Sequence, residues 1–221
     1  MLFRSIVAEY IEGLNLDELL FGEDDDAKTF TIESCDKVNV GKQICQVVAY
    51  LHNLKPAVLH RNIKPANVLV AKESHITKLC DMGLSKVKSA QSLSQTGTVT
   101  SAIPGSPSYM APECLLEKKK ATTYSDVLSL ACTLMELFTE RDCWADLMEL
   151  ENKAIAREDR DDTTHEINLL IALMKRKESP RVFGILPHTI DASVQQILAD
   201  CSQYDIAQRP RAIDIINSLP Q

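Results

Sequence analysis

The feature that most constrains the fold is an apolar run at residues 125–139 that lacks a polar face. Between Val127 and Phe138 the only charged residue is Glu136. A helix that is apolar on all sides needs neighbours on all sides, so the run predicts a helix buried at the centre of a globular domain. It is too short for a membrane span, which needs about 20 apolar residues.

The segments around this run predict a mainly α-helical domain with a few short β-strands. Apolar residues recur at helical spacing over 36–54, which predicts a long amphipathic helix that ends before Pro56. We expect further helices at 194–201 and 211–219, and two short strands at 68–70 and 76–79. The chain of 221 residues is long enough for one domain with its own core.

The first residues predict a strand followed by a short helix. Residues 5–10 favour a strand, which we expect Gly13 to end. Asn15 is a suitable N-cap for a helix at 16–20, and Gly22 is expected to close it.

Charge and cysteine usage limit the partners and the compartment. A net charge of −7 disfavours nucleic acid or an anionic membrane as the main partner, because both attract basic surfaces. The seven cysteines form no C-x-x-C pair, and their number is odd. We therefore expect a reducing, cytoplasmic location.

Six short motifs give a more specific indication. They read V-A-E-Y-I-E-G at 7–13, H-R-N-I-K-P-A-N at 60–67, D-M-G at 81–83, G-S-P-S-Y-M-A-P-E at 105–113, S-D-V-L-S-L at 125–130 and R-P at 209–210. In this order they resemble the motifs of eukaryotic protein kinases, whose catalytic loop reads H-R-D-x-K-P-x-N. Lys64 is typical of the serine/threonine kinases, and the later segments resemble their tyrosine-kinase-like branch.

The resemblance implies the C-terminal lobe of a protein kinase. On this interpretation residues 1–221 form a partial kinase domain, with a hinge at 6–13, a catalytic loop at 60–67, an activation segment at 81–113 and a helical remainder at 114–221. The family's small lobe contains a G-x-G-x-x-G loop and a phosphate-binding lysine. Neither precedes the hinge-like segment, so we expect the small lobe to be missing.

The resemblance also implies roles for individual residues. Asn67 and Asp81 correspond to the magnesium ligands, and Lys64 to the lysine near the transferred phosphate. The backbone of Glu9 and Ile11, with Leu69 beneath, corresponds to the adenine site. Structural roles are expected for His60, Arg61, Glu113, Asp126 and Arg209, with Asp126 bonded to the catalytic-loop backbone and Arg209 paired with Glu113.

Asn62 is the main departure from the family pattern. The family has an aspartate there, which orients the substrate hydroxyl and accepts its proton. An amide has the same shape but is not a useful base at neutral pH. We expect catalysis to be impaired, because losing a general base costs about 10²–10⁴-fold.

Three hypotheses remain open from the sequence. The chain is a pseudokinase-like signalling or scaffold module that binds a protein partner, an active serine/threonine kinase whose N-terminal lobe lies outside this sequence, or a truncated product without independent function. The resemblance implies Mg²⁺ and ATP as cofactors and a protein as substrate or partner. We expect this chain alone to bind ATP weakly or not at all.

Overall fold

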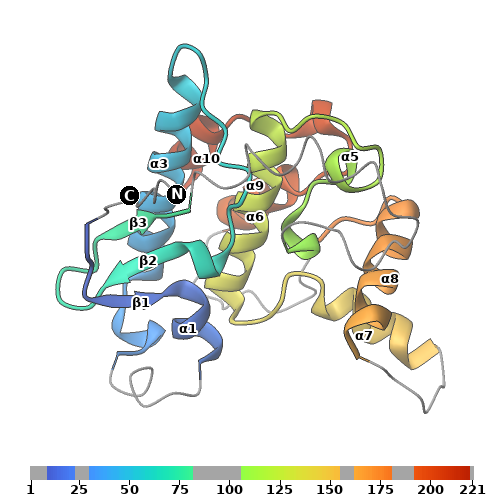
Figure 1. Ribbon diagram of the computed structural model, residues 1–221, viewed down its shortest axis with the longest axis horizontal. Helices are drawn as coiled ribbons and strands as arrows, with labels where there is room; N and C mark the ends of the chain where they lie inside the picture. The colour runs from blue at the N-terminus through green and yellow to red at the C-terminus, as the bar shows by residue number, and fades with distance from the viewer. Residues whose placement is uncertain (1–8, 23–29, 82–105, 155–161, 181–191, 220–221) are drawn as a thin grey trace, which may run out of the picture.

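Helix α6 (Thr123–Thr139) forms the centre of the molecule. The computed structural model describes residues 9–22, 30–81, 106–154, 162–180 and 192–219. Within them, every residue of α6 from 125 to 138 is buried, which confirms the predicted central helix. A capping box between Thr122 and Ser125 starts the helix, and Glu140 ends it in the left-handed conformation. In Figure 1 the sheet lies on one side of α6, and α7 and α8 lie on the other.

Helix α3 (Lys37–Asn53) is the predicted amphipathic helix. The side chain of Asp36 caps it by accepting from the amide of Asn39 at 3.1 Å. Its apolar face packs against α6 and α10 (Ala212–Ser218). A Cβ atom at Gly41 would lie only 3.3 Å from side-chain atoms of Leu134 and Phe138, so the glycine permits the close approach of α3 to α6.

A small antiparallel sheet covers one end of α3. It consists of β1 (Gly13–Asn15), β2 (Val68–Ala71) and β3 (Thr77–Leu79), in the order β1-β2-β3. Leu69 of β2 pairs with Asn15 on one side and with Lys78 on the other. Val68 and Val70 face the core, and Leu69 is half-buried on the opposite face. The two predicted strands after the octapeptide 60–67 are therefore confirmed.

The strand predicted at residues 5–10 is absent from the two of its residues that the structure describes. Residues 5–8 lie outside the described part, Glu9 and Tyr10 are not in a strand, and Gly13 begins β1 instead of ending a strand. A Cβ atom at Gly13 would lie 2.0 Å from the carbonyl oxygen of Val70, so only glycine allows this approach to β2. The following helix α1 (Leu16–Phe21) was predicted correctly, with Asn15 in a capping box and Gly22 at its C-cap.

The remaining helices extend the helical part of the fold. They are α5 (Pro112–Leu115), α7 (Ala145–Ala154), α8 (Asp162–Lys175) and α9 (Ala192–Cys201), with 3-10 turns at Ile32–Ser34, Pro65–Asn67, Pro107–Tyr109 and Ile206–Gln208. The sequence predicted α9 and α10 but neither α7 nor α8. All seven cysteines are free. Among the described helices, none has the length and apolar character to cross a membrane.

Candidate active site

Asp126 fixes the backbone at the start of the octapeptide. One carboxylate oxygen accepts from the amide of His60, and the other from the amide of Arg61, each at 2.8 Å. His52 Nε2 lies 3.1 Å from the first of these oxygens. Arg61 has a φ of 69°, which is unfavourable for a residue other than glycine and is held by these contacts. The expected bond between Asp126 and the loop backbone is confirmed.

His60 connects the octapeptide to the end of β3. Its ring is fully buried, and Nε2 lies 3.0 Å from the carbonyl oxygen of Cys80. The amide of Asn62 donates to Nδ1 at 3.3 Å. Because a carbonyl only accepts, the proton is on Nε2 and the imidazole is neutral. Burial lowers the pKa of His60, which agrees with that neutral form.

Hydrogen bonds link Asn62 to Asn67 and to Asp81 where the octapeptide approaches the end of β3. Asn62 Nδ2 donates to Asp81 Oδ2 at 3.1 Å, and Asn67 Nδ2 donates to the carbonyl oxygen of Asn62 at 2.7 Å. The amide of Cys80 donates to the carbonyl of Asn67 at 2.9 Å. The chain turns through a left-handed residue at Asp81, with φ of 62°. Three polar side chains are thus brought together from two segments.

The oxygen atoms of Asn67 and Asp81 are of the chemical kind that binds magnesium, and their role toward a metal stays a prediction. Asn67 donates a hydrogen bond through Nδ2, which leaves its Oδ1 available as an acceptor. Asn62 bonds to Asp81 Oδ2, and Asp81 has a second carboxylate oxygen, Oδ1. A carboxylate and an amide oxygen are hard ligands, and protein-bound Mg²⁺ takes its other ligands from water and phosphate. Asn67 is buried, and Asp81 is exposed.

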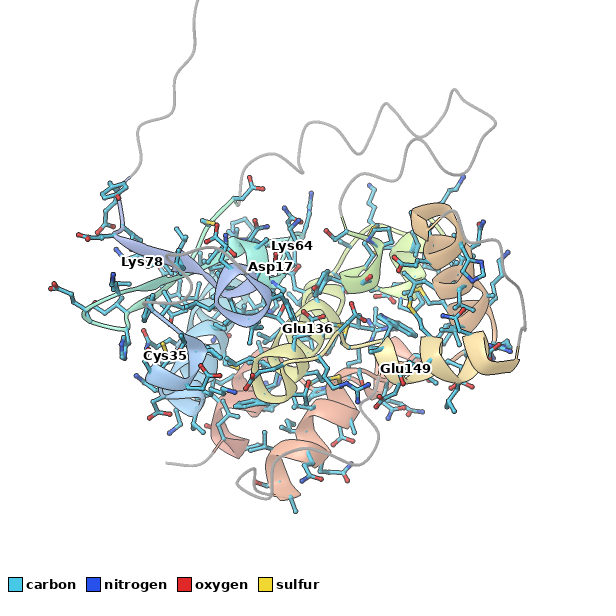
Figure 2. The ribbon with its side chains drawn as sticks, turned by 90° about the horizontal axis from the view of Figure 1, so that it is seen from below. Asp17, Cys35, Lys64, Lys78, Glu136 and Glu149 are labelled. Atoms are coloured by element: carbon cyan, nitrogen blue, oxygen red, sulfur yellow. The ribbon has the colours of Figure 1, made fainter. Side chains whose placement is uncertain are left out.

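Lys64 lies beside this cluster and contacts the segment that follows residue 105. Its Nζ donates to Ser106 Oγ at 3.1 Å. Figure 2 shows Lys64 and Glu136 in the middle of the molecule, with Lys78 toward the sheet and Glu149 toward α7. Met82, Gly83 and most of the predicted activation segment lie outside the described residues.

A second polar group anchors residues 106–110 on the central helix. The Tyr109 hydroxyl donates to Glu136 Oε2 at 2.8 Å, and Trp144 Nε1 donates to the Ser108 carbonyl at 2.9 Å. The Cys143 amide donates to the other oxygen of Glu136 at 3.2 Å. Burial raises the pKa of Glu136 to about 7. This group was not predicted, although a lone glutamate in an apolar helix indicates a buried partner.

Glu113 and Arg209 form the predicted ion pair. The two guanidinium nitrogens lie 2.8 and 2.9 Å from the two carboxylate oxygens, and both residues are buried. Ser125 Oγ also donates to Glu113 at 2.9 Å. The pair joins α5 to the residues just before α10, away from the octapeptide.

The residues proposed for adenine lie on the sheet or beside it. Glu9 is exposed, and its carboxylate forms an ion pair with Lys78 of β3. Ile11 and Leu69 are half-buried. The carbonyl of Glu12 accepts from the Lys72 amide at 3.0 Å, which extends the pairing of this segment with β2. The structure places these residues near one sheet, and their role toward a nucleotide stays a prediction.

A model of the protein kinase domain matches residues 3–219. The chain belongs to the protein kinase domain family. Similar proteins include the serine/threonine-protein kinase CTR1 of Arabidopsis thaliana, 34% identical over 146 residues. Another is the putative mitogen-activated protein kinase kinase kinase 7-like of Drosophila melanogaster, 34% identical over 136 residues. Serine/threonine-protein kinase 36 of Pongo abelii is 36% identical over 133 residues.

These relatives are much longer than the matched region. The alignments cover 65%, 62% and 60% of this chain but only 16%, 31% and 9% of the three relatives. The chain is a mainly α-helical kinase domain with a small sheet, and its similar proteins are serine/threonine kinases. The interpretation of the octapeptide 60–67 as the catalytic loop, with Asn62 where the family has the aspartate, stays a prediction.

Proposed function

We propose that this kinase domain is catalytically impaired and acts as a pseudokinase-like module that binds a protein partner. The observation that supports the proposal is the side chain of Asn62, which stands at the position of the general base and donates to Asp81 at 3.1 Å. An amide nitrogen that donates a hydrogen bond has no lone pair to take a proton from a substrate hydroxyl.

Magnesium, when bound with ATP, neutralises phosphate charge during phosphoryl transfer. Asn67 and Asp81 would hold the ion through their oxygens, and Lys64 would orient the phosphate beside it. Asn62 can orient a hydroxyl group by a hydrogen bond, but it cannot accept the proton. The backbone of Glu9 and Ile11, with Leu69 beneath, would contact the adenine. The chain therefore keeps positioning groups and lacks the base.

The partner surface that we propose includes the segment 106–113 and the helices after it. This segment is fixed in shape, because Trp144 and Glu136 hold Ser108 and Tyr109. A surface with a fixed backbone loses less conformational entropy on binding than a flexible one. The free cysteines support a cytoplasmic location for such a module.

The alternative is an active serine/threonine kinase. The feature that favours it is the retained set of Lys64, Asn67 and Asp81, of which Asn67 and Asp81 are both hydrogen-bonded to Asn62. In that case charge stabilisation and positioning would supply the rate without a carboxylate base.

A phosphotransfer assay separates the two functions. The full chain, Asn62→Asp and Asp81→Ala are each incubated with Mg·ATP and a generic serine/threonine substrate. We expect no transfer above background from the wild-type chain. Robust transfer by the wild-type chain that is abolished in Asp81→Ala would contradict the impaired-kinase proposal and establish the alternative.

A further inference from the structure

The contact between Asn62 and Asp81 joins an amide donor to a carboxylate acceptor at the edge of the candidate metal site. Asn62 is held through its backbone. The amide of Asn62 donates to His60 Nδ1 at 3.3 Å, and its carbonyl accepts from Asn67 at 2.7 Å. These two bonds fix the direction from which the Asn62 side chain reaches Asp81.

An aspartate at position 62 would turn this attractive contact between an amide and a carboxylate into a repulsive contact between two carboxylates. One of its oxygens would take the place of Nδ2 and would lie about 3.1 Å from Asp81 Oδ2. Two carboxylates at that distance repel each other unless a proton or a cation lies between them. In a kinase with the aspartate, a bound divalent cation relieves part of this repulsion, since a metal ion is the largest local charge in its site.

We infer that Asn62 is a positioning residue that stands in for the cation, so that Asp81 keeps its place without any divalent metal. The amide supplies the hydrogen-bond donor that the carboxylate needs, at a residue whose φ of 62° is disfavoured for most side chains. This inference rests on the proposed impaired function. It assigns a structural gain to the asparagine at position 62 in addition to the loss of catalysis. The substitution would make the fold around the loop independent of Mg²⁺.

Thermal unfolding of four forms of the full chain tests this inference. They are the wild type, Asn62→Asp, Asn62→Ala and the exchanged pair Asn62→Asp with Asp81→Asn. Each is melted in EDTA, in millimolar Mg²⁺, and in KCl of the same ionic strength. The KCl arm separates a bound ion from general screening.

The four forms should behave differently. The Tm of the wild type should change less between EDTA and Mg²⁺ than the Tm of Asn62→Asp does. Asn62→Asp should melt about 2–4 °C lower than the wild type in EDTA, and should regain this difference in Mg²⁺ but not in KCl. Asn62→Ala should melt lower in EDTA, and should gain no more stability in Mg²⁺ than the wild type does. The exchanged pair restores an amide–carboxylate bond in the reverse direction, and should return toward the wild-type Tm in EDTA.

Several outcomes would overturn the inference. One is an Asn62→Asp variant that matches the wild type in EDTA. Another is a wild type that itself gains stability in Mg²⁺ as strongly as the variant does. If Asn62→Asp is unfolded in EDTA by circular dichroism, recovery of the fold in Mg²⁺ is the expected result, and failure to recover overturns the inference. Because unfolding requires no phosphotransfer, the inference can fail while the impaired-kinase proposal stands, and the reverse is also possible.

Discussion

Arg209 and Glu113 meet through two parallel hydrogen bonds, and the guanidinium group of Arg209 has a partner for each of its five N–H groups. NH1 and NH2 donate to the two oxygens of Glu113 at 2.8 and 2.9 Å. The other three N–H groups donate to the carbonyls of Gln203, Tyr124 and Tyr204. The planar fork of arginine fits this arrangement, and the single ammonium group of lysine does not.

Arg209→Ala should lower the Tm markedly. The change leaves the buried Glu113 carboxylate without its counter-charge, and removing one partner of a buried pair costs about 3–5 kcal/mol. Arg211→Ala is the matched control, because the Arg211 side chain is 71% exposed in its pair with Asp214 and its loss should change little. Equal Tm changes for the two variants would contradict a structural role of the Arg209 pair.

Glu136→Gln should stabilise the domain at pH 8 but not at pH 5. Burial raises the pKa of Glu136 to about 7, whereas the unfolded chain titrates near the ordinary glutamate value. Between those two pKa values the folded state binds a proton that the unfolded state does not, so wild-type stability falls as pH rises toward 7. Glutamine carries no charge and avoids this loss, which we expect to be about 2–3 kcal/mol at pH 8.

Denaturant unfolding of the wild type and Glu136→Gln across this pH range measures the effect. Glu149→Gln is the control, because Glu149 is exposed beside Arg141. A stability difference between Glu136→Gln and the wild type that stays constant from pH 5 to pH 8 would mean that the buried carboxylate does not titrate in this window.

Thr77→Val should raise the stability. The hydroxyl of Thr77 is buried in β3 and has no hydrogen-bond partner among the described residues. A buried polar group without a partner costs about 1–3 kcal/mol, and valine removes it at nearly the same shape. Thr133→Val is the comparison, because the Thr133 hydroxyl donates to the Ser129 carbonyl at 2.9 Å and its loss should not stabilise. Chemical denaturation of both variants checks the two signs.

Asp126→Asn should loosen the octapeptide. Asp126 accepts the amides of His60 and Arg61 on different oxygens, and asparagine has only one acceptor oxygen. The backbone amide of His60 or of Arg61 then faces the NH₂ group of the asparagine and loses its hydrogen bond, at a cost of about 1–3 kcal/mol. Hydrogen exchange at residues 60–61 should accelerate in the variant more than exchange in β2. Unchanged protection at 60–61 would show that other contacts hold this backbone.

Helical periodicity predicted the helices whose apolar pattern is complete within their own residues. The central helix and α3 have strong apolar patterns, and α1 has a capping residue at each end, so the sequence defines their limits closely. In contrast, α7 and α8 were missed. Leu150 of α7 is 55% exposed, and Trp144 lies just before the helix and is buried. Such helices are stabilised by tertiary packing more than by their own residue pattern.

The candidate site was predicted by resemblance of motifs, not by spacing alone. The motifs predicted correctly that the octapeptide and Asp81 lie close together, since only two short strands separate them in the chain. The anchoring of Tyr109 by Glu136 was not found, because the two residues are 27 positions apart and no periodic pattern links them. The bond from Asn62 to Asp81 was also missed. It depends on side-chain orientations that only the folded backbone determines.

The bonds of Asp126 also bear on the order of events in folding. Its partners His60 and His52 lie 66 and 74 positions earlier in the chain. Closing a loop of this length costs entropy that must be recovered by the packing of α6 against α3. We expect the octapeptide to acquire its shape only after those two helices dock, so that the site forms late although its residues are contiguous. Pulse-labelling of amides during refolding would show residues 60–61 protected after the core of α3, and earlier protection would refute this order.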